Sequence, residues 1–235
     1  VHFWISDRLG VLRAIYPVHA YLSTWNLECS DNAPSWMPDI IKRAVYQNAS
    51  PANQLVYISP NGNSAQCVNG WTGDMFRSPP VGEQTRFRYA SLTKLFTADT
   101  VLSLVRAGRL ELGQRLVDLF PELLSVKDQR VSTITIEHLL RHTAGFDRYE
   151  TPDPLFEHYD KPWCHYDLAV LSSVSLDYTP GKKVSYSNVG YCLLGKVIER
   201  ITGTPYRVII RQRYQTAAKG MLFVNGSYRE GEVVY

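Results

Sequence analysis

Ser91 and Lys94 are the residues whose types and spacing best fit nucleophilic catalysis. They lie three residues apart at the start of an apolar, helix-like stretch, so a helix brings both side chains to one face. There the lysine amine can take the serine proton, which makes the hydroxyl a nucleophile. A helix N-terminus also presents backbone N–H groups to the oxyanion that forms in such an attack.

The alternative for this pair is that Ser91 simply caps the helix, a role that serine often fills, because a lone Ser-x-x-Lys is common. Lys94 argues against this alternative. A cation in the first turn opposes the helix dipole at a cost of ~0.3 to 1 kcal/mol, and the expected helix has no polar face to carry it into solvent. Burial and the positive helix end both favour the neutral amine, which is the form that acts as a base.

Tyr186 and Asn188 form a second candidate pair, between a Pro-Gly turn and an apolar helix. Residues two apart in an extended segment project to the same side, so both can face one cavity. A phenol there supplies a proton shuttle, and an amide supplies a substrate hydrogen bond. Taken alone, this triplet favours the alternative in which Tyr186 packs in the core and Asn188 caps the helix.

His142 ends a short helix, and its position favours a structural role as a histidine stabilised by the helix dipole. Asp99, Glu137 and His138 are interpreted as structural or solvated residues. Because no spacing fits a metal site or a phosphate loop, no metal and no cofactor are expected.

The elements that must position these residues are mostly helical. Residues 91–107 are apolar almost all round, which predicts a helix buried in the middle of the protein. Residues 38–47 predict an amphipathic helix that opens with a proline, and residues 54–59 and 65–72 predict strands joined by a turn at 60–63. A helix packed on an antiparallel hairpin follows. The expected apolar side of the helix comprises Ile40, Ile41, Ala44 and Val45.

Further along the chain, cap and breaker residues mark three helices. Thr135 caps a short one, Asn188 can cap a longer one that ends before Gly203, and Pro205 opens a third. Residues 145–166 predict a long loop rich in proline and aromatic residues. Long ordered loops in compact domains are often functional.

Composition bounds the partners. With 235 residues, 45% of them hydrophobic, the chain can bury a core in one large domain or two small ones. The 25 Lys+Arg and 22 Asp+Glu residues give a net charge of +3, and the cations are scattered, so no nucleic-acid partner is expected. No apolar stretch reaches the ~18 residues of a transmembrane helix. Because the chain starts at Val1 and shows no signal pattern, we expect a processed or removed N-terminus.

Four cysteines, Cys29, Cys67, Cys164 and Cys192, allow three pairings, and none has zinc-site spacing. Two disulfides in an exported protein and four buried thiols both remain open. For Cys192, in an apolar helix, the thiol is the default.

Three motifs occur in the order and approximate spacing of a known family. They are Ser-Leu-Thr-Lys at 91–94, the stretch 136–146 with its His-Thr-Ala-Gly, and the stretch 180–191 with its Tyr-Ser-Asn. On these motifs the sequence resembles the serine β-lactamase and DD-peptidase superfamily, in its class C-like branch, which also contains esterases and transacylases. The resemblance covers about residues 38–235. It implies an α+β fold, with an antiparallel sheet and flanking helices plus a helical domain, and a site between the two.

The resemblance also implies a role for each residue. Ser91 would be the acylated nucleophile, Lys94 its activator, Tyr186 the general acid/base and Asn188 a substrate-amide contact. Family members carry a third motif, Lys-Thr-Gly or His-x-Gly, on a strand well beyond the Tyr-x-Asn element. Lys219-Gly220 lies too close and has the wrong spacing. We therefore expect either a fragment of a longer enzyme or a shortened product with an incomplete site, the C-terminal part of the fold being missing.

The expected organisation has four parts. Residues 1–37 form an unassigned N-terminal arm, 38–88 the first part of the α/β subdomain, 89–215 a helical subdomain with the motifs, and 216–235 the start of a segment leading to the missing part.

The expected function is a serine acyl-transfer hydrolase that forms an acyl-enzyme on Ser91 with a β-lactam, a D-alanyl peptide or an ester. Tyr-Ser-Asn, in place of the Tyr-Ala-Asn associated with class C β-lactamases, favours a peptidase or an esterase. The expected partner is a small-molecule or peptide substrate, and the expected location is the periplasm or the exterior of a bacterial cell. The rival is an inactive family member that binds or scaffolds without turnover; the missing third motif supports it and the intact motif residues oppose it.

Overall fold

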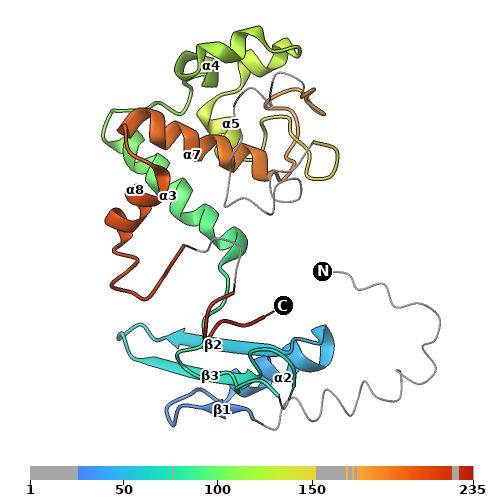
Figure 1. Ribbon diagram of the computed structural model, residues 1–235, viewed down its shortest axis with the longest axis vertical. Coiled ribbons are helices and arrows are strands. Elements are labelled where there is room, and N and C mark those ends of the chain that lie inside the picture. Colours follow the sequence, from blue (N-terminus) through green and yellow to red (C-terminus); the bar gives the residue numbers. More distant parts are fainter. Residues whose placement is uncertain are drawn as a thin grey trace, which may run out of the picture. The chain divides into compact units, whose positions relative to one another are not determined.

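The computed structural model describes residues 26–75, 77–151, 168, 171, 174–223 and 228–234. The chain divides into two compact units, residues 1–88 with 228–235, here the sheet unit, and residues 89–227, here the helical unit (Figure 1). Cys164, most of the expected N-terminal arm and most of the expected loop at 145–166 lie outside the described residues.

The sheet unit contains three antiparallel strands in the order β1-β3-β2. They are β1 (Glu28–Cys29), β2 (Ala52–Ile58) and β3 (Ser64–Gly70). The β2–β3 turn contains Gly62, whose φ of +85° suits a residue without Cβ. The expected hairpin is confirmed, and the pairing of β1 on its other side adds a strand that the sequence pattern did not indicate.

Helix α2 (Trp36–Asn48) packs on this hairpin and buries Ile41 and Val45, as expected, but it begins before Pro38 and its buried side is not the whole of the expected one. Met37, Ile41 and Val45, spaced by four residues, are buried with residues of β3. Ile40 is 44% exposed, so its expected place on the buried side is wrong.

The cysteine chemistry also differs from the default. Cys29 lies opposite Cys67 in the β1–β3 ladder, and the two form a disulfide. Cys192 is also disulfide-bonded, so the expectation of a buried thiol there is wrong.

Residues 228–234 return to the sheet unit. The N–H of Arg86 donates to the carbonyl of Gly231 at 2.8 Å, and the N–H of Val233 donates to the carbonyl of Arg86 at 2.9 Å. The side chain of Val233 is buried with Val81. The sheet unit is therefore built from two segments of the sequence, one before and one after the helical unit.

The elements of the helical unit are η1 (Ala90–Leu92), α3 (Thr93–Arg106), α4 (Leu116–Leu119), η2 (Pro121–Ser125), η3 (Gln129–Thr133), α5 (Ile136–Leu140), α7 (Asn188–Thr202) and α8 (Tyr206–Tyr214). The three longer helices, α3, α7 and α8, contact one another, and α5 contacts α7. None of the helices in the described ranges is long and apolar enough to cross a membrane.

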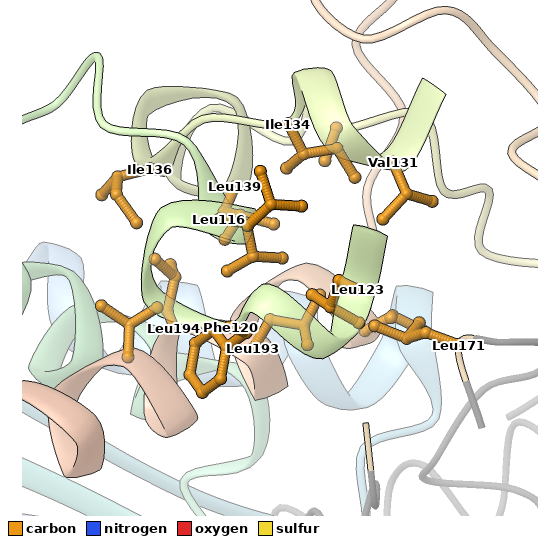
Figure 2. Close-up of a cluster of buried hydrophobic side chains, with 14 of the residues drawn as sticks. Leu116, Phe120, Leu123, Val131, Ile134, Ile136, Leu139, Leu171, Leu193 and Leu194 are labelled. Carbon is orange, nitrogen blue, oxygen red and sulfur yellow. The ribbon is translucent and has the colours of Figure 1, made fainter. Parts of the chain in front are cut away.

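One apolar cluster joins α7 to the short helices around α4 and α5. Figure 2 shows Leu193 and Leu194 of α7 among the side chains of Leu116, Phe120 and Leu139. Each of these side chains is at most 3% exposed, and burying such a side chain contributes about 1.5 to 3 kcal/mol. The cluster therefore holds together α7, which begins at Asn188, and α5, which ends two residues before His142.

Helix α3 is not buried all round, contrary to the expectation. Its buried residues are Thr97, Thr100, Val101 and Leu104, on the side that α7 and α8 contact. Leu92, within the motif, and Leu95, directly after it, are 56% and 66% exposed. The start of α3 is therefore open on one side.

Two of the expected helix caps can be compared with the structure. The hydroxyl of Thr135 accepts a hydrogen bond from the N–H of His138 and caps α5, as expected. At α7 the cap is Ser187, whose hydroxyl accepts from the N–H of Gly190, and Asn188 is the first helical residue. The side chain of Asn188 is thereby left for another role.

Candidate active site

Ser91 and Lys94 lie at the beginning of α3, as the motif requires. The single 3-10 turn η1 carries Ser91 and leads directly into α3, so the offset of three residues brings both side chains to one face. The ammonium nitrogen of Lys94 donates to Ser91 Oγ at 3.5 Å. No side-chain cap is present at η1 or α3, so the capping alternative for Ser91 is not what the structure has.

Tyr186 brings its phenol to the same hydroxyl. Ser91 Oγ and Tyr186 OH are 2.6 Å apart, and either can be the donor. Lys94 Nζ lies 4.7 Å from the centroid of the Tyr186 ring. Burial is the largest influence on the Tyr186 pKa and raises it, but hydrogen bonds from Lys94 and Ser91 and the charges of Lys94 and Arg148 outweigh burial, so the pKa is lowered from 10.0.

Asn188 completes the group. Its Oδ1 accepts a hydrogen bond from Lys94 Nζ at 2.6 Å and lies 3.4 Å from Tyr186 OH. Ser187 between the two residues is extended, with φ −143° and ψ 133°, so the two-residue spacing does place Tyr186 and Asn188 on one side. The structure thus brings all four expected site residues together within the helical unit.

His142 holds the segment that carries Tyr186. Its ring stacks on Tyr186, with centroids 4.7 Å apart, and contacts the ring of Tyr191 at 4.9 Å. The N–H of Ser187 donates to His142 Nδ1 at 3.1 Å, and the N–H of Ser185 donates to the His142 carbonyl at 2.8 Å. Three of these contacts, with Ser185, Tyr186 and Ser187, hold the segment that carries the phenol.

His142 has a structural role, as expected, but it does not end the helix. It follows α5 with its backbone in the left-handed region, at φ +56°. Burial, and then the charge of Lys94, lower its pKa from 6.5, so the neutral ring that can accept from Ser187 is favoured. Sequence reasoning missed this role because a positive φ leaves no clear signal at a histidine.

A tight turn after His142 presents one more charge. The carboxylate of Asp147 accepts from the N–H of Tyr149 at 2.9 Å and from the hydroxyl of Ser185 at 2.8 Å. These two hydrogen bonds, in that order, lower the Asp147 pKa. The next residue, Arg148, places its guanidinium carbon 5.5 Å from the centroid of the Tyr186 ring. The aspartate itself is the sequence signal for this turn, because Asp side chains commonly accept a hydrogen bond from the N–H two residues further on.

The chemistry that this arrangement supports is proton transfer at a serine hydroxyl. An oxygen nucleophile, a phenol with a lowered pKa and an ammonium group form one hydrogen-bonded cluster at a helix start. Among the described residues no group of three His, Cys, Asp or Glu side chains is placed to hold a metal ion.

A family model described as Beta-lactamase matches residues 44–219. Among curated proteins, a putative fimbrial assembly protein FimD, serogroup D, from Dichelobacter nodosus is 37% identical over 223 residues, covering 95% of this chain and 56% of that protein. Penicillin-binding protein 4 from Amycolatopsis lactamdurans is 31% identical over 55% of this chain and 33% of that protein. The chain thus spans about half the length of the fimbrial assembly protein and a third of the length of the penicillin-binding protein.

Solved structures show the same fold. D-amino acid amidase from Ochrobactrum anthropi SV3, complexed with D-phenylalanine, has a TM-score of 0.63 and 27% identity over 80% of this chain and 51% of that chain. A class C beta lactamase has the same TM-score at 24% identity, over 79% of this chain and 48% of that chain. A D-stereospecific amidohydrolase from Streptomyces sp. is 33% identical, with a TM-score of 0.50, over 59% of this chain and 44% of that chain.

Proposed function

This chain belongs to the beta-lactamase family and has its α+β fold, and we propose that it is a serine acyl-transfer hydrolase that forms an acyl-enzyme on Ser91. The observation that carries the proposal is the cluster of Ser91 Oγ, Tyr186 OH and Lys94 Nζ, in which the first two atoms are 2.6 Å apart. A serine that only caps a helix needs no phenol of lowered pKa at its hydroxyl.

In the first half of the proposed reaction Ser91 Oγ attacks the carbonyl carbon of an amide or ester. Its proton passes to the phenolate oxygen of Tyr186, which lies 2.6 Å from Ser91 Oγ. Lys94, as an ammonium group, stabilises that phenolate. Tyr186 then gives the proton to the departing nitrogen or oxygen as the bond to the carbonyl carbon breaks.

In the second half a water molecule takes the place of the leaving group. Tyr186 accepts a proton from the water as it attacks the acyl carbon, and returns the proton to Ser91 Oγ when the carboxylic acid leaves. The amide of Asn188, held by Lys94, is placed to bind an amide of the substrate, and the N–H of Ser91 serves as an oxyanion donor.

The substrate class that we propose is an amide or ester with a D-configured centre, such as a D-alanyl peptide, or a β-lactam. The support comes from the D-amino acid amidase and the penicillin-binding protein among the relatives. We place the protein outside the reducing cytoplasm, in the bacterial periplasm or beyond it, because Cys29 and Cys67 form a disulfide.

A second function has one observation in its favour. The 37% identical relative is named as a fimbrial assembly protein, which supports a member of the fold that binds or scaffolds without turnover. The intact cluster around Ser91 supports the enzyme instead.

Steady-state and burst kinetics separate the two functions. The protein is expressed with any flanking sequence that its gene encodes, and is assayed with a chromogenic cephalosporin and a D-amino acid 4-nitrophenyl ester. Turnover that disappears in Ser91→Ala supports the hydrolase. A folded protein that turns over neither reagent above the Ser91→Ala background supports the scaffold.

A further inference from the structure

We infer that Arg148 recognises a carboxylate on the substrate, so that the preferred acyl donors are anionic. The inference rests on the proposed acyl-enzyme on Ser91 and names the charge of its substrate. It begins from the position of the guanidinium, whose carbon lies 5.5 Å from the centroid of the Tyr186 ring and 5.6 Å from that of Tyr149.

The turn that carries Arg148 is fixed at both ends. The N–H of Asp147 donates to Thr151 Oγ1 at 2.9 Å and lies 3.1 Å from Asp177 Oδ2. Thr151 Oγ1 in turn donates to Asp177 Oδ2 at 2.6 Å, and Thr151 is buried. A binding group on such a turn loses little further conformational entropy when it engages a ligand.

The carboxylate of the neighbouring Asp147 is occupied by other hydrogen-bond donors. The carboxylate oxygens of Asp147 accept hydrogen bonds from the hydroxyls of Ser185 and Tyr178 and from the N–H of Tyr149. Its negative charge is therefore used to hold the loop before Tyr186, and the adjacent cation is left for another partner.

Arg148 itself is exposed and, within the part of the chain that the structure describes, forms no ion pair. The other charge at the Tyr186 phenol is the ammonium of Lys94, and the nearby His142 has a lowered pKa, which favours its neutral form. The charged groups that face the phenol are therefore both cations. A planar guanidinium matches a carboxylate with two parallel hydrogen bonds, so a substrate carboxylate is the complementary group.

The carboxylate belongs either to the acyl part of the substrate or to its leaving group. Matched ester pairs distinguish them. The 4-nitrophenyl ester of glutaric acid is compared with that of monomethyl glutarate, and 3-carboxy-4-nitrophenyl acetate is compared with its 3-carbamoyl analogue. The quantity measured is the ratio of kcat/KM, charged over neutral, within each pair.

For the wild type we expect a ratio above one in at least one pair, and for Arg148→Gln a ratio about tenfold lower in that pair, the effect of one charge-assisted hydrogen bond in a partly exposed site. Arg148→Glu should lower the ratio further, and Arg148→Lys should restore part of it. Any influence of the Arg148 charge on Tyr186 acts on both esters of a pair and cancels in the ratio. Lys127→Gln removes an equal charge from the exposed connection between η2 and η3 and should leave the ratio unchanged.

The outcomes separate this inference from the proposed function. Ser91-dependent turnover with a ratio that Arg148→Gln does not change in either pair overturns the role of Arg148 alone. Turnover that survives in Ser91→Ala, or no turnover of any ester, overturns the proposed function and the inference with it.

Discussion

The hydroxyl oxygens of Ser91 and Tyr186 lie 2.6 Å apart although 95 residues separate them in the chain. Two local sequence spacings bring a further side chain to each member of this pair. The helical offset carries Lys94 to the serine, and the extended offset carries Asn188 to the side of the phenol. The pair thus joins two segments, each of which brings a second functional group with it.

Replacing the phenol tests its part in proton transfer. Tyr186→Phe keeps the ring that stacks on His142 but removes the proton acceptor, so we expect the acylation rate to fall by about 10² to 10⁴. The rate is measured by stopped flow with a chromogenic ester, and thermal unfolding checks the fold. Tyr191→Phe is the matched control, because Tyr191 also contacts His142 but its hydroxyl donates to the Leu140 carbonyl. A loss in Tyr191→Phe equal to that in Tyr186→Phe would contradict the assignment.

The acylation rate should depend on the ionisation of Tyr186. The reactive form is the phenolate, and the Tyr186 pKa is lowered from 10.0, so the rate should rise with pH and the midpoint of the rise should lie below pH 10.0. Lys94→Met removes both a hydrogen bond and a charge that lower this pKa, so the rise should move to higher pH and the plateau should be lower. Rates are compared from pH 5 to pH 10.5, a range chosen to span the expected change around the tyrosine's ordinary pKa. A rise at the same pH in both proteins would argue against Tyr186 as the group that titrates.

His142 should act on the rate through Tyr186 without touching substrate. His142→Asn keeps an acceptor for the Ser187 N–H and tolerates the φ of +56°, whereas His142→Leu does neither. We expect His142→Asn to lower kcat by a few fold, His142→Leu to lower it by tenfold or more, and KM to change less than kcat in both. Equal effects of the two substitutions would show that the acceptor is unimportant.

Much of the site could be predicted from the sequence. The helix that begins near Ser91 and the extended run before Asn188 follow from local patterns, and the resemblance to a family linked the two. What could not be predicted depends on contacts distant in sequence. The exposure of Leu95 reflects which side of α3 is covered by α7 and α8, and no periodicity in a uniformly apolar stretch indicates that side.

The pairing of the cysteines stayed open and the role of His142 was missed, for related reasons. Four cysteines with no characteristic spacing leave their pairing open, and it is the register of a two-residue strand that places Cys29 opposite Cys67. A backbone at positive φ, which lets His142 reach Ser187 with its ring and Ser185 with its carbonyl, is not encoded by residue type there.

The disulfide should stabilise the sheet unit. It closes a loop with a sequence separation of 38 residues, for which the chain-entropy model gives about 4 kcal/mol. The double variant Cys29→Ala/Cys67→Ala should therefore unfold at a lower denaturant concentration, measured by circular dichroism in urea. Because Ser91 lies in the helical unit, its acylation rate in the absence of denaturant should be retained. An unchanged unfolding midpoint would show that the cross-link adds no stability.

The most direct test of the account is the location of the acyl group. The protein is incubated with a penicillin and, separately, with a chromogenic D-amino acid ester, quenched in acid, and analysed by intact mass and peptide mapping. We predict a single adduct, with the mass of the whole penicillin or of the acyl part of the ester, on the peptide that contains Ser91, and no adduct in Ser91→Ala. An adduct that persists in Ser91→Ala, or that maps to another residue, would contradict the account.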